Sequence, residues 1–304
     1  MKQSIEYYYS LKINELFLEN NTYHFTLDKE DYYFVYFHRS EKDLKDILQC
    51  ISELKAKNID CHDIILNNKK EILTKIDNVN YILLKVRNKD EIYEINDLIQ
   101  MNKKLLLINQ KNDLHRNDWA NLWSAKIDYI EQQLKEIKVD SIITYSIDYY
   151  LGLAENAIYY VNSISLKYQI SSNDKIVLSR KRILIPNYKL NYLNPLTFIF
   201  DLEVRDIAEY IKSSFFAGED ALLELETYLK SIKLSLYSYN MLFARLLYPS
   251  YYFDIYEGII NKNDDSEKLL KIISKVNDYE IFLKKAYLQI ARYAPLESIN
   301  YLIY

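Results

Sequence analysis

Glycine is scarce in this sequence, with only Gly152, Gly218 and Gly258 among 304 residues. A loop that cradles phosphates needs glycine because its backbone must approach the phosphates closely. None of the three lies in the first 150 residues, so that region contains no glycine-rich phosphate loop. The sequence also lacks a P-loop, a dinucleotide fingerprint, a Gly-x-Ser-x-Gly motif and a His-Glu-x-x-His motif, which argues against the enzyme classes that carry them.

Cysteine and histidine are equally rare, with two and four residues. Cys50 and Cys61 are too few for a disulfide scaffold. The pair Cys61-His62 has no accompanying cluster with the ligand spacing of a zinc site. We therefore expect no metal site here, and a buried or idle thiol at Cys61.

Long apolar runs and an excess of positive charge are missing as well. No run of 18 apolar residues occurs, and the N-terminus has no uninterrupted apolar signal segment, so we expect a cytoplasmic chain without membrane insertion. The formal net charge of −4 and the pI of about 5.7 argue against a general nucleic-acid binder, which would show a basic face. The basic tripeptide Arg180-Lys181-Arg182 is accordingly expected to be solvated surface.

The N-terminal third has the pattern of short strands around one helix. Ser40 offers an N-cap three residues before Asp43, and a helix with one apolar face should follow and end near Lys57-Asn58. Residues 1–40 are expected to contain only strands. The predicted strands, all aromatic or β-branched runs, are 13–18, 22–26, 32–37, 63–66, 71–75 and 80–86.

Helices dominate after Lys89. The spacing of apolar residues predicts one over 94–107 and a long one over 117–137, with Trp119, Leu122 and Trp123 facing inward. The Ala294-Pro295 pair should break the last two helices, because proline cannot continue a helix. The helices predicted in the C-terminal part are 219–233, 236–247, 250–261, 267–275, 278–293 and 296–303.

The stretch from Tyr149 to Tyr210 organises the rest of the chain. Its first part, 149–161, is an amphipathic helix by its apolar spacing. Two β-like runs follow, at 165–170 and 175–178, then a loop over 186–197 and a second amphipathic helix over 201–211. Helix, hairpin, loop and helix is the order in which a protein-kinase-like lobe assembles its catalytic loop, metal-binding turn and central helix.

Several motifs of this region carry a family resemblance. The chain resembles the kinase-like spore-coat proteins of the CotS/YutH group, with the YutH-like branch closest, and these in turn resemble aminoglycoside and choline phosphotransferases. The matching segments run from about residue 115 to 260. They are Trp119-x-x-x-Trp123-x-x-Lys126-x-Asp128-Tyr-x-Glu131, Gly152-Leu-Ala-Glu-Asn-Ala-Ile158, Val204-Arg-Asp-Ile-Ala-Glu-Tyr-Ile211, Leu242-Phe-Ala-Arg-Leu-Leu-Tyr-Pro249 and Tyr252-Phe-Asp-Ile-Tyr-Glu-Gly258.

The resemblance implies an α+β, protein-kinase-like fold of two lobes. Residues 1–88 would form a small N-lobe with an antiparallel sheet and one helix, with the hinge at 81–88. Residues 89–304 would form a large helical C-lobe, in which a degenerate catalytic hairpin occupies 165–201.

The same resemblance assigns positions for the chemistry of phosphoryl transfer, which needs a strand lysine, a carboxylate base and metal ligands. His38 and Arg39 stand where the strand lysine is expected, and with Lys85 they are the weak candidates for cofactor contacts. The plain reading of Arg39 is a surface charge at a strand end.

The catalytic loop of active relatives resembles His-Gly-Asp, with an Asn about five residues on. Laid on residues 166–175, this pattern puts Lys167 and Gln169 on the His and Asp positions, and Lys175 or Asp174 on the Asn position. A glutamine cannot accept a proton near neutral pH, and a lysine repels Mg²⁺. Asp174 could instead supply an oxygen to a metal, although the base would still be missing.

Three residues complete the implied site. Thr197 falls on the metal-ligand position and lacks the charge that Mg²⁺ sites use. Asp201 is the nearby carboxylate that could serve instead, and is equally well explained as a helix N-cap. Asp206 falls where kinase-like folds keep a helix-borne aspartate that hydrogen-bonds the catalytic-loop backbone, which is a structural role.

These assignments favour a catalytically inactive kinase-like protein with a structural or assembly role. By resemblance, other spore-coat proteins would be its partners and the spore coat its destination, and no cofactor or metal is expected. One alternative is a small-molecule phosphotransferase with a rearranged Mg·ATP site that uses Asp174 or Asp201. Another is a ligand-sensing or partner-binding module that uses the cleft between the lobes.

Overall fold

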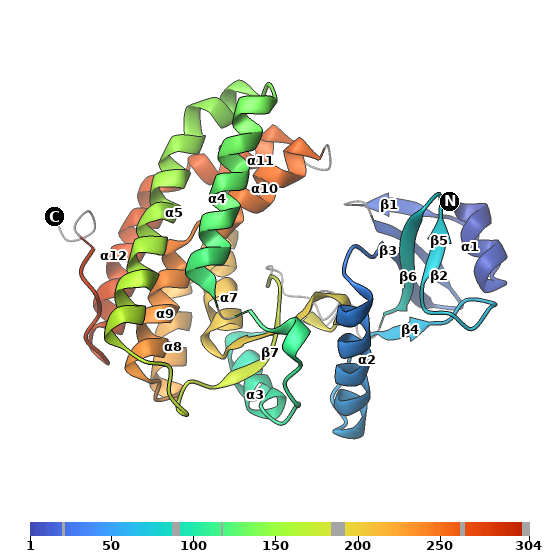
Figure 1. Ribbon diagram of the computed structural model, residues 1–304, viewed down its shortest axis with the longest axis horizontal. Helices are drawn as coiled ribbons and strands as arrows, with labels where there is room; N and C mark the ends of the chain where they lie inside the picture. The colour runs from blue at the N-terminus through green and yellow to red at the C-terminus, as the bar shows by residue number, and fades with distance from the viewer. Residues whose placement is uncertain (20–21, 87–91, 117, 184–191, 262–264, 300–304) are drawn as a thin grey trace. The chain divides into compact units, whose positions relative to one another are not determined.

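A computed structural model of the protein describes residues 1–19, 22–86, 92–116, 118–183, 192–261 and 265–299. The chain divides into two compact units (Figure 1). The described residues of unit 1 fall in Met1–Ile92, Lys111–Leu114 and Tyr188–Phe198, and unit 2 contains the others. Among the helices of these described residues, none combines the length and apolar character needed to cross a membrane.

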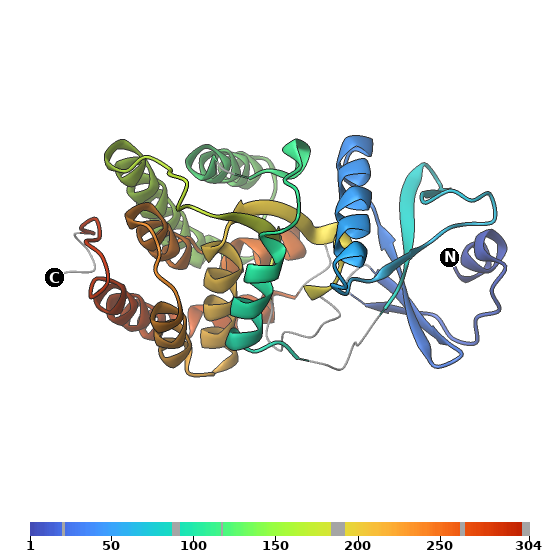
Figure 2. The same ribbon diagram turned by 90° about the horizontal axis from the view of Figure 1, so that it is seen from below.

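Unit 1 is built on an antiparallel sheet with strand order β1-β2-β3-β6-β4, and β5 also pairs with β6. Helices α1 and α2 lie on different sides of this sheet (Figures 1 and 2). The elements are α1 (Lys2–Tyr9), β1 (Phe17–Glu19), β2 (Thr22–Leu27), β3 (Glu30–Tyr36), α2 (Glu41–Ala56), β4 (Asp63–Ile65), β5 (Thr74–Ile76) and β6 (Val79–Lys85).

Two hairpins of the sheet turn without glycine. The β2–β3 turn has φ angles of 51° at Asp28 and 67° at Lys29, and the β5–β6 turn has 49° at Asp77 and 64° at Asn78. Two-residue hairpin turns of this kind need positive φ at both central residues, because only then does the turn match the twist of the strands. In a chain with so little glycine, Asp and Asn fill three of these four positions, since they tolerate the left-handed region better than most residues.

The helix and four of the six expected strands of unit 1 are present, while only the ends of the strands expected over 13–18 and 71–75 are strand; the expectation that 1–40 holds only strands is wrong. Residues Lys2–Tyr9 form α1, in which Ile5 and Tyr9, one helical turn apart, enter a core with Phe25, Phe34 and Leu83. The three consecutive tyrosines favour a strand locally, and burial of this face overrides that preference. Ser40 caps α2 as predicted, since its hydroxyl accepts from the backbone N–H of Asp43 at 3.1 Å.

Unit 2 is mostly helical, and its short strands β7 and β8 pair with each other. Helix α5 packs against α4 and α9, and α7 packs against α9 and α8 (Figure 1). The elements are α3 (Ile95–Leu105), α4 (Trp119–Glu136), α5 (Ser141–Lys167), β7 (Ile176–Arg180), β8 (Phe198–Leu202), α7 (Val204–Ala217), α8 (Ala221–Ser231), α9 (Leu236–Leu247), α10 (Ser250–Ile260), α11 (Ser266–Ile273) and α12 (Val276–Ile290). Figure 2 shows these helices from below.

Four expectations for unit 2 are wrong. No strand forms over 165–170: α5 continues to Lys167, because the apolar spacing runs on through Val161 and Ile164 and no glycine or proline interrupts it, and 168–170 are neither helix nor strand. The helix expected over 201–211 begins only at Val204, since 198–202 are strand β8. The helix expected over 296–303 is absent from its described part, 296–299, and the rest lies outside the described residues. In α4, Trp123 is buried as predicted, but Leu122 is 42% exposed.

Candidate functional site

Asp201, in strand β8, is a carboxylate of the predicted site that accepts four hydrogen bonds. It is 1% exposed. Its Oδ2 accepts from Nη1 of Arg205 at 2.8 Å and from Nη2 of Arg245 at 2.6 Å. Its Oδ1 accepts from the indole N–H of Trp119 at 3.1 Å and from the backbone N–H of Leu202 at 2.7 Å. Both oxygens therefore already have two donors each, and the N-cap interpretation of Asp201 is wrong.

Three separate elements supply the side-chain donors. Arg205 lies in the first turn of α7, four residues after Asp201, while Arg245 comes from α9 and Trp119 begins α4. Both guanidinium groups also lie over the Trp119 ring, with Cζ at 4.6 Å for Arg205 and 4.3 Å for Arg245 from its centroid. Cations at such distances are attracted by the negative face of the ring. The arginines are thus fixed on one side by a carboxylate and on another by an indole.

The start of α7 also holds the end of β7 and the residue after it. Oδ1 of Asp206 accepts from the backbone N–H of Arg180 at 3.0 Å, and Nε of Arg205 donates to the Arg180 carbonyl at 2.9 Å. Nη2 of Arg205 donates to the carbonyl of Lys181 at 2.9 Å. Burial raises the pKa of Asp206 to about 6, and the nearby charge of Arg180 opposes that rise. The backbone at Arg180 and Lys181 is therefore positioned by charged groups.

A second polar cluster lies further along α7. Lys212 donates from Nζ to Glu209 at 2.8 Å and to Ser250 at 2.6 Å, and Arg182 pairs with Asp254 and, at 3.9 Å, with Glu209. Burial alone would raise the pKa of the Glu209 carboxyl. The charges of Lys212 and Arg182, with that of Arg205, outweigh burial and hold this pKa at about 2. Glu209 is consequently ionised throughout the physiological range.

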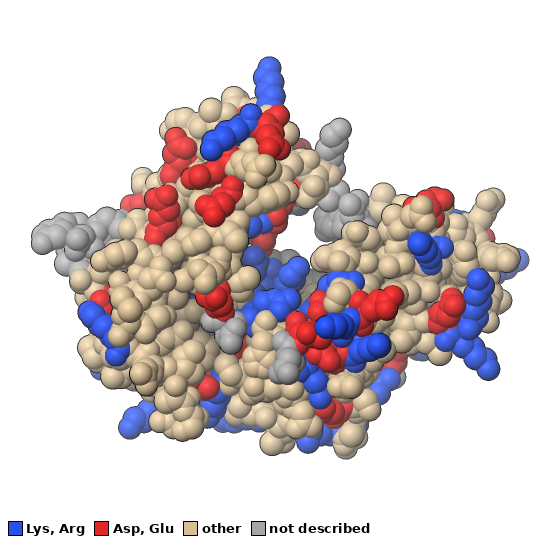
Figure 3. All heavy atoms as spheres, in the orientation of Figure 1, with Lys and Arg blue, Asp and Glu red and all other residues tan. Residues whose placement is uncertain are grey.

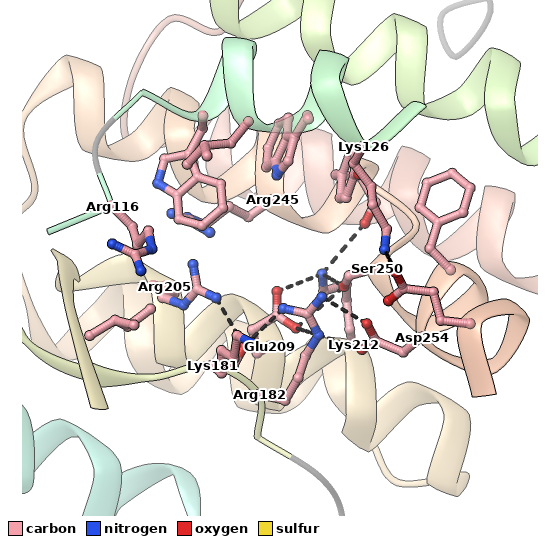
Figure 4. Close-up of a pocket in the computed structure, with 17 residues that line it drawn as sticks. Arg116, Lys126, Lys181, Arg182, Arg205, Glu209, Lys212, Arg245, Ser250 and Asp254 are labelled. Carbon is pink, nitrogen blue, oxygen red and sulfur yellow. Dashed lines mark hydrogen bonds and ion pairs between the residues drawn. The ribbon is translucent and has the colours of Figure 1, made fainter. Parts of the chain in front are cut away.

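Several of these groups line a pocket of about 460 Å³ in unit 2 (Figure 4). Seven of its lining side chains are basic and three are acidic, so the lining carries a formal charge of +4. The basic residues are Arg116, Lys126, Lys181, Arg182, Arg205, Lys212 and Arg245, the acidic ones are Glu209, Asp254 and Glu257, and the others are Trp119, Leu122, Trp123, Ile199, Tyr248, Ser250 and Phe253. In the space-filling view, Lys and Arg atoms gather near the centre of one face (Figure 3).

The residues proposed for the catalytic loop lie elsewhere and are not brought together with Asp201. Lys167 is exposed at the end of α5 and pairs with Glu297 at 2.6 Å, and Gln169 is exposed just beyond. Lys175 is exposed as well. Asp174 is buried and accepts hydrogen bonds from Ser235, Ser171 and Ser238. These bonds outweigh burial and lower its pKa, so the structure gives it a role in tying a turn to α9.

The remaining predicted residues also have structural partners. The Thr197 hydroxyl donates to the carbonyl of Asn194 at 2.9 Å. Arg39 is not the free surface charge of the plain reading, because it pairs with Asp43 at 2.9 Å and donates to the Phe198 carbonyl at 2.8 Å.

Two further candidates for cofactor contacts lie in unit 1. His38 is exposed beside the Tyr36 ring, and Lys85 pairs with Glu30 at 3.0 Å.

The side chains around Asp201 do not fit a magnesium ion. Mg²⁺ requires oxygen ligands in near-octahedral geometry. Two arginines contact Asp201, and their charges repel a cation. Among the described residues, no group of three or more His, Cys, Asp or Glu is arranged to hold a metal.

Sequence reasoning missed Arg180, Arg205 and Arg245 as parts of this site. The expectation of a solvated surface is wrong for Arg180, which is 1% exposed. A usable signal existed, because Arg245 stands within the apolar run Leu242-Phe-Ala-Arg-Leu-Leu, and a charge in such a run is buried only when it is paired. The i,i+4 spacing of Asp201 and Arg205 is also visible in the sequence. With a helix expected to start at Asp201, that spacing did not suggest a buried ion pair.

Comparisons with known proteins agree with this architecture. A family model described as "Spore coat putative kinase YutH" matches residues 2–286. The endospore coat-associated protein YutH of Bacillus subtilis (strain 168) is 29% identical over 187 residues, which cover 55% of this chain and 55% of that protein. The chain therefore spans about half the length of this curated relative in the match.

Solved phosphotransferases share the fold. The crystal structure of spectinomycin phosphotransferase APH(9)-Ia with ADP and spectinomycin has a TM-score of 0.62 at 11% identity, covering 95% of this chain and 97% of that one. An aminoglycoside phosphotransferase from Alicyclobacillus acidocaldarius has a TM-score of 0.54 at 14% identity, covering 96% and 97%. At these identities the likeness shows the fold alone. The predicted α+β, kinase-like fold is confirmed, and so is the predicted family resemblance.

Proposed function

The chain belongs to the YutH family of spore coat kinase-like proteins, and we propose that it is a catalytically inactive member with a structural or assembly role in the spore coat. The observation that carries this proposal is the state of Asp201, whose carboxylate is shared by Arg205 and Arg245. An active phosphotransferase needs carboxylate oxygens for Mg²⁺ and a base beside the acceptor hydroxyl. The residues of unit 2 argue against both the metal site and the base.

The metal requirement fails at Asp201. A carboxylate can hold Mg²⁺ only if the groups that already bind it leave. Releasing Arg205 and Arg245 would leave two buried guanidinium groups without their counter-ion, which is strongly unfavourable. Asp201 is therefore better suited to organising α4, α7 and α9 than to binding a metal.

The base requirement fails as well once the position of the loop is reconsidered. In kinase-like folds the helix-borne aspartate bonds the catalytic-loop backbone, and here Asp206 accepts from Arg180. This bond supports a register in which Arg180-Lys181-Arg182, rather than residues 167–169, corresponds to His-Gly-Asp. Asn187 then follows Arg182 by five residues, the spacing of the family's Asn, although it lies outside the described residues.

In that register an arginine takes the place of the base. An arginine stays protonated at all physiological pH values, so it cannot accept the proton of an acceptor hydroxyl. Arg182 also forms an ion pair with Asp254, which keeps its guanidinium in place. In this register the site has no base and no free carboxylate for a metal. The first 150 residues also lack the glycines of a phosphate loop.

A role among other proteins is supported by the relative and by the surface of α5. The Bacillus subtilis relative is described as endospore coat-associated. Tyr145, Tyr159 and Leu166 of α5 are 83%, 73% and 90% exposed, and their spacings of 14 and 7 residues place them on one face of the helix. Exposed aromatic side chains of this kind are enriched at protein interfaces.

The test is an assay of phosphate release from ATP with Mg²⁺, with wild type and Asp201→Asn compared. We expect no turnover above that of the buffer in either protein. Turnover by the wild type that Asp201→Asn abolishes would overturn the proposal and favour the phosphotransferase alternative. The coat role is tested by fractionating spores of the host. Recovery with the insoluble coat layers is the expected result, and recovery only with soluble spore proteins contradicts it.

A further inference from the structure

We propose that the pocket in unit 2 binds a small organic anion, with its phosphate or carboxylate group at the arginine-rich side and an apolar part against the tryptophans. This inference does not depend on the proposed function, because it concerns binding without chemistry. It also differs from the cleft predicted from the sequence, since every lining residue belongs to unit 2.

Charge is distributed unevenly within the pocket. On one side lie Arg116, Lys181, Arg205 and Arg245, and the carboxylate that contacts two of these arginines is Asp201 (Figure 4). The pocket lining as a whole carries a formal charge of +4, and basic side chains predominate on this side. A concave site of one sign attracts ligands of the opposite sign, and its low-dielectric walls strengthen the attraction.

On the other side, the charges cancel. Lys126 pairs with Glu257, Arg182 with Asp254, and Lys212 with Glu209 (Figure 4). Three basic and three acidic side chains leave no formal excess there. An anionic group should consequently prefer the side of Arg116 and Arg245.

One donor on the positive side has no protein partner. Arg245 is 2% exposed, and its Nε is buried without a hydrogen bond among the described residues. A buried donor on a charged group that remains unsatisfied costs about 1–3 kcal/mol or more. Such groups call for a specific explanation, and a ligand oxygen that accepts from Nε while Nη2 stays on Asp201 is one.

The pocket wall next to the arginines is aromatic. Trp123 stacks on Tyr248 with ring centroids 4.2 Å apart. The indole N–H of Trp119 donates to Asp201, the carboxylate that both arginines contact. Leu122 and Phe253 extend the apolar surface. The volume of about 460 Å³ falls within the usual range for small-molecule sites, about 300–1,000 Å³. Charge on one side and apolar surface on the other suit an anion with a flat apolar body.

Tryptophan fluorescence offers a direct assay, because the chain has only two tryptophans and both line this pocket. The probes are phenyl phosphate and benzoate, with benzylamine as the cationic control and inorganic phosphate as the anion without an apolar body. We expect a saturable change with phenyl phosphate, with benzoate or with both, and binding that weakens as salt is added. We expect benzylamine to give none. The order of the two anions shows whether a phosphate or a carboxylate suits the site better.

Variants locate the binding. Arg116→Gln and Lys181→Gln should each weaken the probe that binds by about tenfold, as expected for a lost charge-assisted contact of about 1.4 kcal/mol. Lys126→Gln, a matched change on the neutral side, should alter affinity less than threefold. Melting temperatures of the variants show whether each remains folded. No saturable change with either anion, equal binding of benzylamine, or affinity unaffected by Arg116→Gln and Lys181→Gln would overturn the proposal.

Discussion

Asp201→Asn tests whether this carboxylate holds the fold together or serves a metal. The substitution keeps the size of the side chain and removes its charge. Arg205 and Arg245, which are 2% exposed, then lose the counter-ion that they share. An asparagine also places an N–H₂ group where one carboxylate oxygen now accepts. The N–H groups that donate to that oxygen would then face another donor, and their hydrogen bonds would be lost.

The size of the effect follows from burial. Removing one partner of a buried ion pair typically costs about 3–5 kcal/mol, because the remaining charge is left uncompensated. The same range applies here, since the pairs of Asp201 with Arg205 and Arg245 measure 2.8 and 2.6 Å and are both buried. We therefore expect Asp201→Asn to lower the free energy of unfolding by about 3–5 kcal/mol.

The assay is equilibrium unfolding in urea, read by far-ultraviolet circular dichroism. The control is Lys167→Gln, which breaks the ion pair of Lys167 with Glu297 at the exposed end of α5 and should leave the midpoint unchanged within error. A double-mutant cycle with Arg245→Met isolates the pair, because Asp201→Asn should cost less once one of the two arginines is absent. A loss below about 1 kcal/mol for Asp201→Asn, within the range of a surface pair, would refute this reasoning.

Three other predictions concern titration and backbone strain. Asp206 has a folded pKa of about 6 against 3.8 in the unfolded chain. Its contribution to stability is therefore present below pH 3.8, and about 3 kcal/mol is lost as the pH rises through 6. Asp206→Asn should remove this pH dependence from urea midpoints measured between about pH 4 and 7. Glu209 has a folded pKa of about 2 against 4.5, so its contribution is present above pH 4.5 and is lost as pH falls toward 2, and Glu209→Gln should be less stable than wild type at pH 6 but lose less stability on acidification. An unchanged pH profile in either variant would contradict these assignments. Lys29→Gly should raise the melting temperature slightly, because glycine removes the strain of φ 67° at a cost of about 0.5–1 kcal/mol in chain entropy; a fall of several degrees would contradict it.

Local signals in the sequence were enough for much of the fold. The cap at Ser40, the strand at 80–86 and the helix around Trp123 follow from short-range patterns that tertiary packing reinforces. The failures arose where packing overrode a local preference. Residues 2–9 form a helix because Ile5 and Tyr9 reach the sheet core, although three tyrosines favour a strand.

The site was harder to predict because it depends on pairings across long sequence separations. Asp201 meets Arg245 across 44 residues and Trp119 across 82, and no pattern of spacing encodes such contacts. The strand expected over 165–170 is α5 as far as Lys167, and the catalytic-loop pattern laid on this stretch falls on exposed residues such as Gln169. Asp206 and Asp201 were identified as relevant carboxylates from the sequence, but their partners required the structure.

The most direct test of the central claim is calorimetric titration of the protein with ATP, once with Mg²⁺ and once with a chelator. The claim is that Asp201 is held by Arg205 and Arg245 and cannot bind a metal. The account predicts no nucleotide binding that requires Mg²⁺, and any binding in the anion pocket should be weaker with Mg²⁺, because the ion neutralises part of the ATP charge. Saturable binding that requires Mg²⁺ and disappears in folded Asp201→Asn would contradict it.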